Sequence, residues 1–132
     1  LDIRECLEIL AVEKCIENAD ADHLRALADL TLELEQALDN DDYKRVNDLD
    51  SKFHREIAKA SSIKTLAKFV AEVEDYMRIA RVLEKRSSAR ERCETALRQH
   101  KKVLDCITRG DKEGAKQAIK ENIQSLRNHL GL

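Results

Sequence analysis

Proline and tryptophan are absent from this chain of 132 residues, and glycine occurs only three times. Hairpins and tight turns depend on proline and glycine, and strands are enriched in aromatic residues, which make up only 3% of the chain. The composition therefore excludes a fold rich in β-hairpins. Leucine, alanine, glutamate, lysine and arginine are abundant, and all five favour helices. We expect an all-α fold.

Long apolar runs are also absent, because 38% of the residues are charged, and this excludes a membrane-spanning helix. The first ten residues lack the basic start and apolar run of a signal peptide, so we expect a cytoplasmic protein. None of the four cysteines belongs to a C-x-x-C pair, and we interpret them as reduced packing thiols. No linker rich in glycine, proline or serine divides the chain, which indicates one domain over residues 1–132.

The common motifs of nucleotide-binding and hydrolytic enzymes are missing. The chain contains no G-x-x-x-x-G-K-[ST] or G-x-G-x-x-G loop for phosphates, no G-x-S-x-G nucleophile elbow and no H-E-x-x-H zinc motif. No histidine is preceded three residues earlier by glutamate, which excludes the E-x-x-H pattern of di-iron bundles. These absences argue against an enzyme.

Six amphipathic segments follow one another, separated by short polar breaks. We expect helices at about 2–18, 21–39, 41–60, 62–85, 88–109 and 111–130. Aspartate or serine stands at or near the start of each segment, where a helix N-cap is favourable, and Gly110 marks a helix stop before a new start. Short connections between long helices predict an antiparallel bundle.

Four polar side chains fall on the apolar faces of three predicted helices. Asp50 and His54 lie within or beside the apolar stripe of the third helix. His100 shares the apolar face of the fifth helix, and Asn122 shares that of the sixth. Burying an unpaired carboxylate costs several kcal/mol, and an unpaired amide or imidazole costs roughly 1–3 kcal/mol. We therefore expect the four groups to bind one another or a cation.

Asp50 and His54 are four residues apart, so their side chains leave successive turns of one helix toward nearly the same point. An imidazole with a carboxylate oxygen suits Zn²⁺, Ni²⁺, Mn²⁺ or Fe²⁺ better than Ca²⁺. The alternative is a set of hydrogen-bonded core residues without a metal, because Asp-x-x-x-His pairs also arise by chance. The residues alone leave both interpretations open.

Four motifs occur in order along the chain: R-E-C-L-E-I-L-A at 4–11, D-S-K-F-H-R-E-I-A at 50–58, Q-H-K-K-V-L-D-C-I at 99–107 and R-G-D-K-E-G-A-K-Q-A at 109–118. In this order and spacing they resemble the FCD domain, the effector-binding C-terminal domain of the FadR subfamily of GntR-type bacterial transcription regulators. The resemblance covers nearly the whole chain. It implies an antiparallel bundle of six to seven helices that forms a homodimer. It also implies that only an upstream winged-helix domain contacts DNA, so we expect this chain to be a fragment of a longer regulator.

The resemblance also implies a metal site. Many FCD domains hold a divalent metal with one aspartate and three histidines, and Asp50, His54 and His100 match the first three of these positions. The fourth position falls on Asn122. An amide oxygen is a weaker and harder ligand than imidazole, so we expect lower affinity for zinc or nickel. This departure favours an oxygen-tolerant metal or a metal-free pocket.

The expected effector is a small organic acid whose carboxylate takes an open position on the metal. A basic side chain closes the other end of the site, and we expect Arg78 first and Arg81 second in this role. The reason is that a guanidinium matches a carboxylate with two hydrogen bonds. The alternative is that both arginines form only solvated ion pairs.

Three functional classes therefore compete. A metal-dependent hydrolase needs a general base beside a metal-bound water, and the sequence offers no further buried glutamate or histidine at a suitable spacing. A metal-free dimerisation bundle needs neither metal nor effector. We favour the third class, the effector-binding domain of a transcription regulator, which is not an enzyme.

Overall fold

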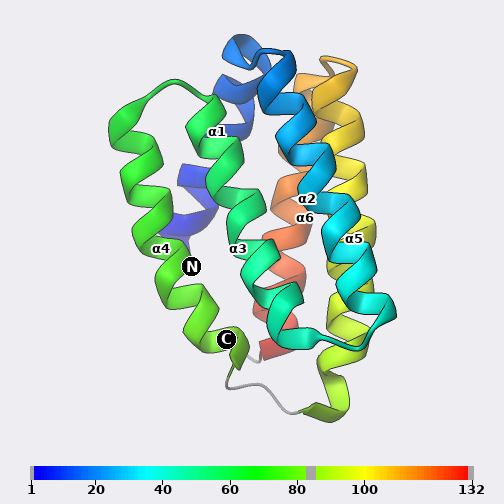
Figure 1. Cartoon of the computed structure of the whole chain (residues 1–132). Helices are drawn as coiled ribbons and strands as arrows, with labels where there is room; N and C mark the ends of the chain where they lie inside the picture. The colour runs from blue at the N-terminus through cyan, green and yellow to red at the C-terminus, as the bar shows by residue number, and fades with distance from the viewer. Residues whose placement is uncertain (1, 83–85, 131–132) are drawn as a thin grey trace.

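Six α-helices follow one another in the computed structural model, which describes residues 2–82 and 86–130, with side chains for 2–82 and 88–128 (Figure 1). They are α1 (Asp2–Asn18), α2 (Ala21–Asp39), α3 (Tyr43–Ala60), α4 (Lys64–Val82), α5 (Arg86–Thr108) and α6 (Lys112–Leu130). The described residues contain no strand. The predicted all-α bundle of antiparallel helices is therefore confirmed.

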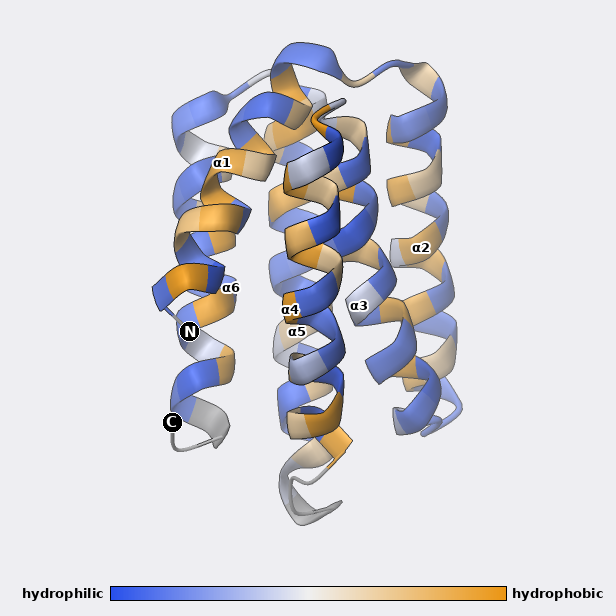
Figure 2. Cartoon of the chain, turned by 90° about the vertical axis from the view of Figure 1, so that its left-hand side faces the viewer, coloured by the Kyte–Doolittle hydropathy of each residue, from blue (hydrophilic) through white to orange (hydrophobic). Residues whose placement is uncertain are grey.

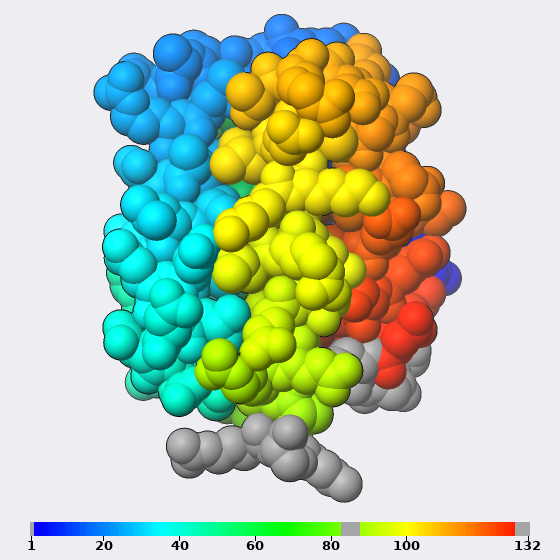
Figure 3. All heavy atoms as spheres, turned by 90° about the vertical axis from the view of Figure 1, so that its right-hand side faces the viewer, coloured from blue at the N-terminus to red at the C-terminus, as the bar shows by residue number. Residues whose placement is uncertain are grey.

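The third helix holds the central position in the bundle. It contacts α1, α2, α4 and α5, and Figure 1 shows it between α4 on one side and α2 on the other. On the face seen in Figure 3, α5 lies between α2 and α6. As a result, α3 and α5, which carry three of the four predicted metal ligands, contact each other inside the bundle.

Three helices begin two residues away from the start that the periodicity predicts. Asp41 has a φ of 54°, so the N-cap of α3 is Asp42 and the helix begins two residues later than expected. Ser62 has a φ of 63°, which moves the start of α4 to Lys64. In contrast, α5 already begins at Arg86. The predicted end of the fourth helix, at 85, lies outside the described residues.

The start and stop signals at Asp20, Gly110 and Asp111 act as expected. The carboxylate of Asp20 accepts a hydrogen bond of 2.9 Å from the backbone N–H of His23 at the start of α2. Gly110 has a φ of 70°, a conformation that favours glycine, and it follows the end of α5. Asp111 then accepts a hydrogen bond of 3.0 Å from the backbone N–H of Gly114 in the first turn of α6.

Two apolar clusters fill the interior, and a polar layer lies between them along α3. The larger cluster includes Phe53 and Ile57, and the smaller one includes Val46 and Leu49. Asp50 comes between these two pairs and is itself buried. The fold therefore places the predicted site residues of α3 where the apolar core is interrupted.

Two predictions from composition can be compared with the structure. Among the described helices, none combines the length and the apolar character that a membrane crossing requires. No disulfide joins any of the cysteines, which all lie in the described residues. Three of them are buried, as expected for packing residues, whereas Cys6 is exposed on α1.

Candidate metal and effector site

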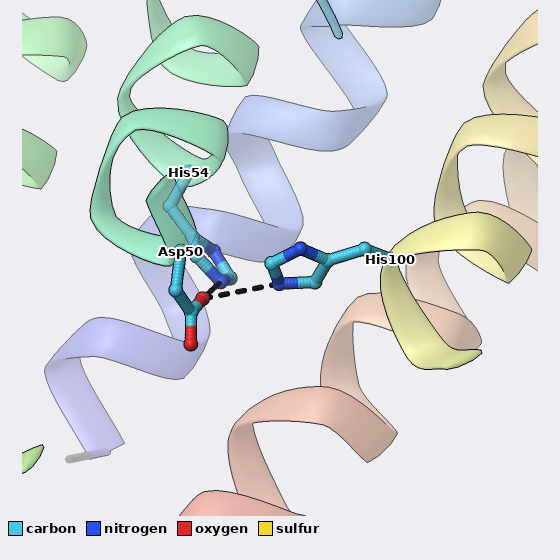
Figure 4. Close-up of side chains that lie close together, drawn as sticks. All are labelled: Asp50, His54 and His100. Carbon is cyan, nitrogen blue, oxygen red and sulfur yellow. Dashed lines mark ion pairs between the residues drawn. The ribbon is translucent and has the colours of Figure 1, made fainter. Parts of the chain in front are cut away.

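Asp50, His54 and His100 meet inside the bundle (Figure 4). Asp50 and His54 leave successive turns of α3, and His100 approaches them from α5. The Oδ1 atom of Asp50 lies 3.2 Å from Nε2 of His54 and 3.0 Å from Nε2 of His100. The three residues are only 3%, 1% and 0% exposed, in that order. Three ligand atoms, one from each residue, lie within 4.8 Å of one another.

These close contacts are not hydrogen bonds. Within the described part of the chain, Oδ1 of Asp50 and the Nε2 atoms of His54 and His100 have no hydrogen-bond partner. Buried polar atoms are nearly always hydrogen-bonded, so three unsatisfied atoms around one point indicate a site for a further group such as an ion. Two imidazole nitrogens and one carboxylate oxygen are a ligand set that Zn²⁺ and similar divalent ions accept. The residues present therefore fit a divalent cation.

The other nitrogen of the His54 ring faces α1. There Nδ1 of His54 contacts Oε1 of Glu8. The second oxygen of Glu8 accepts a hydrogen bond of 2.5 Å from Nε of Arg4, one helical turn earlier. Nη2 of Arg4 also donates to Oε1 of Glu74 on α4, at 2.8 Å. These contacts form a continuous chain of buried ionisable side chains across α3, α1 and α4, in the order His54, Glu8, Arg4 and Glu74.

Arg81 closes this series into a ring. Its Nη1 atom lies 3.2 Å from Oε2 of Glu74, and its Nε atom lies 3.3 Å from Oδ2 of Asp50. Nη1 also donates to Oγ of Ser51, at 3.0 Å. The four charged residues from α1 and α4 that surround the cluster are called the ion network below; they are Arg4, Glu8, Glu74 and Arg81.

The ion network gives the two histidines different charge states. Burial lowers the pKa of His54, but the two nearby glutamates outweigh burial and raise it to about 10. Burial also lowers the pKa of His100, and the attraction of Asp50 does not offset this effect. Burial raises the pKa of Asp50, yet the charge of Arg81 holds it well below its ordinary value. In the metal-free protein, His54 is therefore charged and His100 is neutral near pH 7.

A small cavity adjoins Asp50. Its volume is about 20 Å³, and its lining includes Arg81, Arg92, Gln99 and Asn122. This is enough space for one water molecule. Asn122 is buried and donates a hydrogen bond of 2.8 Å from Nδ2 to Oε1 of Gln99. That bond uses the amide nitrogen and leaves the oxygen of Asn122 for another partner.

A wider groove lies on the outer side of Arg81. Its volume is about 400 Å³, and Tyr43, Asn47 and Ala89 contribute to its walls. Asn47 accepts a hydrogen bond of 2.5 Å from Nη2 of Arg92, which lines the inner cavity. Arg81 lines both the inner cavity and the outer groove, so it stands at the boundary between them.

Comparison with known protein families identifies the domain. The family model of the FCD domain matches residues 1–125. The chain belongs to the FCD domain family. The match confirms the resemblance that the four sequence motifs indicated, and it extends from α1 into α6.

The known proteins that are similar to this FCD domain include a bacterial relative and a solved structure. YdhC of Bacillus subtilis (strain 168), described as an uncharacterized HTH-type transcriptional regulator, is 33% identical over 119 residues, which are 89% of this chain and 52% of YdhC. The chain therefore spans about half the length of this relative. The solved structure of E. coli McbR/YncC matches with a TM-score of 0.83 and 23% identity. The match covers 98% of this chain and 61% of the McbR/YncC chain. This likeness shows that the two share a fold.

The FCD domain brings together three of the four predicted metal ligands, namely Asp50, His54 and His100. The fourth, Asn122, lies on the wall of the cavity that Asp50 also lines. The two predicted effector-binding arginines separate, because three residues along a helix differ by about 60° in direction. Arg81 is buried against Asp50, whereas the side chain of Arg78 is 50% exposed, with Nη1 3.9 Å from Oδ1 of Asp48.

The apolar periodicity of the chain gave no sign that Arg4, Glu8 and Glu74 belong to the site. Arg4 and Glu8 are four residues apart on one helix, which is the spacing of an ordinary surface ion pair. The motif R-E-C-L-E-I-L-A contained both residues and was the one available signal. Two buried glutamates, Glu8 and Glu74, also lie near His54, so the prediction that no further buried glutamate stands beside the metal ligands was wrong.

Proposed function

We propose that this FCD domain is the ligand-sensing domain of a cytoplasmic GntR/FadR-type transcription regulator. It binds a small organic acid through a divalent metal and thereby changes DNA binding by a winged-helix domain of the longer protein. Membership of the FCD family supports this role, as does the similarity to a relative described as an HTH-type transcriptional regulator.

One observation carries the proposal. Three ligand atoms without a hydrogen-bond partner among the described residues, one each from Asp50, His54 and His100, lie close together in a buried layer of the core. These residues would hold the metal, and Asn122 would add an amide oxygen or bind a water from the cavity wall. The metal supplies a Lewis acid that binds a carboxylate. Zn²⁺, Ni²⁺, Mn²⁺ and Fe²⁺ are the candidate ions, and the amide in place of a third imidazole shifts the preference toward Mn²⁺ and Fe²⁺.

Arg81 is the residue that we propose as the carboxylate clamp. Its guanidinium lies beside Asp50 and lines both the inner cavity and the outer groove. Arg78 lies on the surface beside Asp48, where it can meet an effector only at the outside of the bundle. For these reasons Arg81 replaces Arg78 as the first candidate.

The small volume of the inner cavity links effector binding to a change in the arrangement of the helices. At about 20 Å³, the cavity is too small for an organic acid in this arrangement. An effector that enters must therefore select a more open arrangement of the surrounding helices. A ligand that binds one arrangement better than another shifts the population between them, which is the requirement for a sensor.

A second copy of the chain is the proposed partner of the domain. Most of the exposed large apolar side chains belong to α1 and α4, which contact each other, and Figure 2 shows the face of the bundle with α4 in front. Those on α1 and α4 are Ile3, Leu10, Phe69, Tyr76, Ile79 and Val82. Spacings of three and seven residues place them on one side of each helix, as in helices that pack against a partner.

The low pKa of Glu8, the glutamate in contact with His54, argues against a hydrolase. Burial raises the pKa of Glu8, but Arg4 and His54 together lower it to about 2. A carboxylate with so low a pKa is a weak general base near pH 7. Glu74 is likewise bound by two arginines. We therefore propose a role in binding rather than catalysis.

A metal-free dimerisation module is the second candidate, and the protonated His54 favours it. Charged His54 lies between the carboxylates of Glu8 and Asp50, so the buried layer can balance these charges without a metal. In that case the domain has no effector that depends on a metal.

Elemental analysis of freshly purified protein, followed by thermal-shift titrations, separates the two candidates. We expect about one bound metal per chain and a rise in Tm with at least one of the four ions. Small mono- and dicarboxylates should raise Tm further only when the metal is present. A ligand at 100 times its Kd stabilises the folded state by about 2.7 kcal/mol, which is readily measured.

His100→Ala should abolish the metal-dependent shift, because it removes one of the three converging ligands. His23→Ala is the control, since His23 belongs to the N-terminal cap of α2 and lies outside the cluster. Absence of metal, together with no response to any ion, would leave the dimerisation module as the function. Metal binding without a response to any carboxylate would instead reject the organic acid as effector.

A further inference from the structure

The proposed function leaves the opening motif R-E-C-L-E-I-L-A unexplained. Its two charged residues that are buried, Arg4 and Glu8, project from α1 into the layer that holds Asp50 and His54. Neither of them belongs to the group of three ligand atoms that converge around Asp50.

The two nitrogens of His54 have different surroundings. Nε2 faces Asp50 and has no hydrogen-bond partner within the described part of the chain. Nδ1 contacts the carboxylate of Glu8. The ring is therefore held at one nitrogen from α1, and its other nitrogen is directed toward the candidate cation point.

Glu8 is itself held in place on both sides. Arg4 binds its second oxygen, and Arg4 is in turn fixed by Glu74, at 2.8 Å. The side chains of these three residues are at most 4% exposed. A carboxylate held in this way has little freedom to follow a rotating imidazole, so it can set the orientation of the ring.

The positive and negative charges of the ion network balance within the network. Two arginines face two glutamates, so the network adds no net charge to the candidate cation point. Apolar side chains of similar volume usually stabilise a core as well as a buried ion pair does. Stability alone is therefore a weak reason to bury these four residues, and a role in orienting the site accounts for them.

We infer that Glu8 is a positioning residue of the metal site, which accepts a hydrogen bond from Nδ1–H of His54 and thereby directs Nε2 toward the metal. Metal-binding histidines commonly donate their second ring N–H to such a carboxylate, which fixes both the tautomer and the direction of the ring. The inference rests on the proposed metal site.

Titration of the chain with Co²⁺, followed by its visible absorption, gives the first test. Glu8→Gln retains an oxygen acceptor without the charge and should weaken Co²⁺ binding by about 10-fold, whereas Glu8→Ala removes the acceptor and should weaken it by about 100-fold. Glu5→Gln is the matched control on α1, because Glu5 contacts Gln124 and none of the ion-network residues. It should leave the affinity unchanged.

Glu74→Gln distinguishes positioning from general loss of stability. It disturbs the ion network but leaves the carboxylate of Glu8 in contact with Nδ1 of His54, so a purely structural role predicts the same loss of affinity as Glu8→Gln. Positioning predicts a clearly smaller loss. Equal Co²⁺ affinity in wild type and in folded Glu8→Ala would overturn the inference, whereas absence of Co²⁺ binding in wild type would overturn the proposed metal site instead.

The tautomer of His54 gives a second test that needs no folded variant. Long-range ¹H–¹⁵N NMR spectra of the Zn²⁺-loaded wild-type protein should show Nδ1 protonated and Nε2 bound to the metal. Protonation at Nε2 would overturn the inference even if every variant of Glu8 failed to fold. Where Glu8→Ala does fold, the signal of Nδ1–H should broaden or shift because its acceptor is gone.

Discussion

The imidazole of His100 lies parallel to the phenyl ring of Phe53, with ring centroids 4.1 Å apart and planes inclined by 7°. Phe53 belongs to α3, between Asp50 and His54. One helix therefore supplies two of the candidate ligands and also the surface on which the third one rests. This stack restricts rotation of the His100 ring and keeps Nε2 directed at Asp50.

Phe53→Leu should weaken metal binding as well as stability. The substitution removes the stacked ring and leaves space in the larger apolar cluster, so we expect the free energy of unfolding to fall by about 1–3 kcal/mol. Metal affinity should fall several-fold because His100 gains rotational freedom. Urea unfolding and metal titration measure the two effects. Leu32→Ala, at an exposed position of α2 outside the proposed dimer face, is the control and should change neither. Loss of stability with unchanged metal affinity would limit Phe53 to a packing role.

Asp50→Asn should abolish tight metal binding and destabilise the metal-free protein. The amide cannot balance the charge of Arg81, whose Nε lies 3.3 Å from Oδ2 of Asp50. Breaking a buried ion pair on one side costs about 3–5 kcal/mol. Asp48→Asn breaks the exposed pair with Arg78 on the same two helices and should change stability by less than about 1 kcal/mol. Chemical unfolding in EDTA compares the free energies of unfolding of the two variants. Similar decreases would contradict the expectation that the buried ion pair costs more to break than the exposed one.

The metal-free protein should lose stability in acid. Burial raises the pKa of Glu8, but Arg4 and His54 lower it from 4.5 to about 2. Because the folded-state pKa is the lower one, the unfolded chain binds protons first as the pH falls. The contribution of Glu8 is therefore fully present above about pH 5 and is lost as the pH falls through 4.5 toward 2. Asp50 acts in the same direction.

Urea unfolding in EDTA between pH 6 and pH 3 measures this dependence. Glu8→Gln should reduce its slope, since the amide does not titrate. An unaltered slope in Glu8→Gln would show that other carboxylates dominate the acid response.

Thiol reagents should distinguish one cysteine from the other three. Cys6 is exposed, whereas Cys15, Cys93 and Cys106 are buried. Burial raises the pKa of Cys15 to about 11, and the nearby carboxylate of Glu56 adds to the effect. The thiolate is the reactive form, so Cys15 should react slowly. Mass spectrometry after brief treatment with a disulfide reagent should find the three buried thiols unmodified in the native protein and all four thiols modified in denaturant. Rapid modification of native Cys6→Ser would contradict the packing described for the buried thiols.

The arrangement of helices could be predicted from periodicity because each helix buries one face, and apolar residues recur on that face at the helical period. The exact starts could not be predicted in the same way. Asp41 and Ser62 adopt positive φ angles that the apolar period does not encode, and each shifts the following helix by two residues. Asp42, rather than Asp41, becomes the cap of α3 because the chain has already turned at Asp41.

The candidate ligands could be predicted because Asp50, His54 and His100 stand where the period requires apolar residues. The ion network could not be predicted in this way, because an arginine or glutamate at the edge of an apolar stripe is normally directed toward solvent. Whether such a side chain is buried depends on partners from distant helices, such as Glu74 for Arg4, which are separated by 70 residues in the sequence. For the same reason the sequence did not separate Arg78 from Arg81, although one faces solvent and the other Asp50.

The charged layer between the two apolar clusters costs stability, and it is also where the proposed metal site lies. Leucine and alanine in that layer would fuse the clusters into one uninterrupted core, and such replacements of buried ions often raise the melting temperature. The resulting bundle would be more stable but would lose the candidate metal ligands. Substitutions that raise the melting temperature should therefore be made at the helix caps and on the solvent-exposed helix surfaces, with the middle of α3 left unchanged.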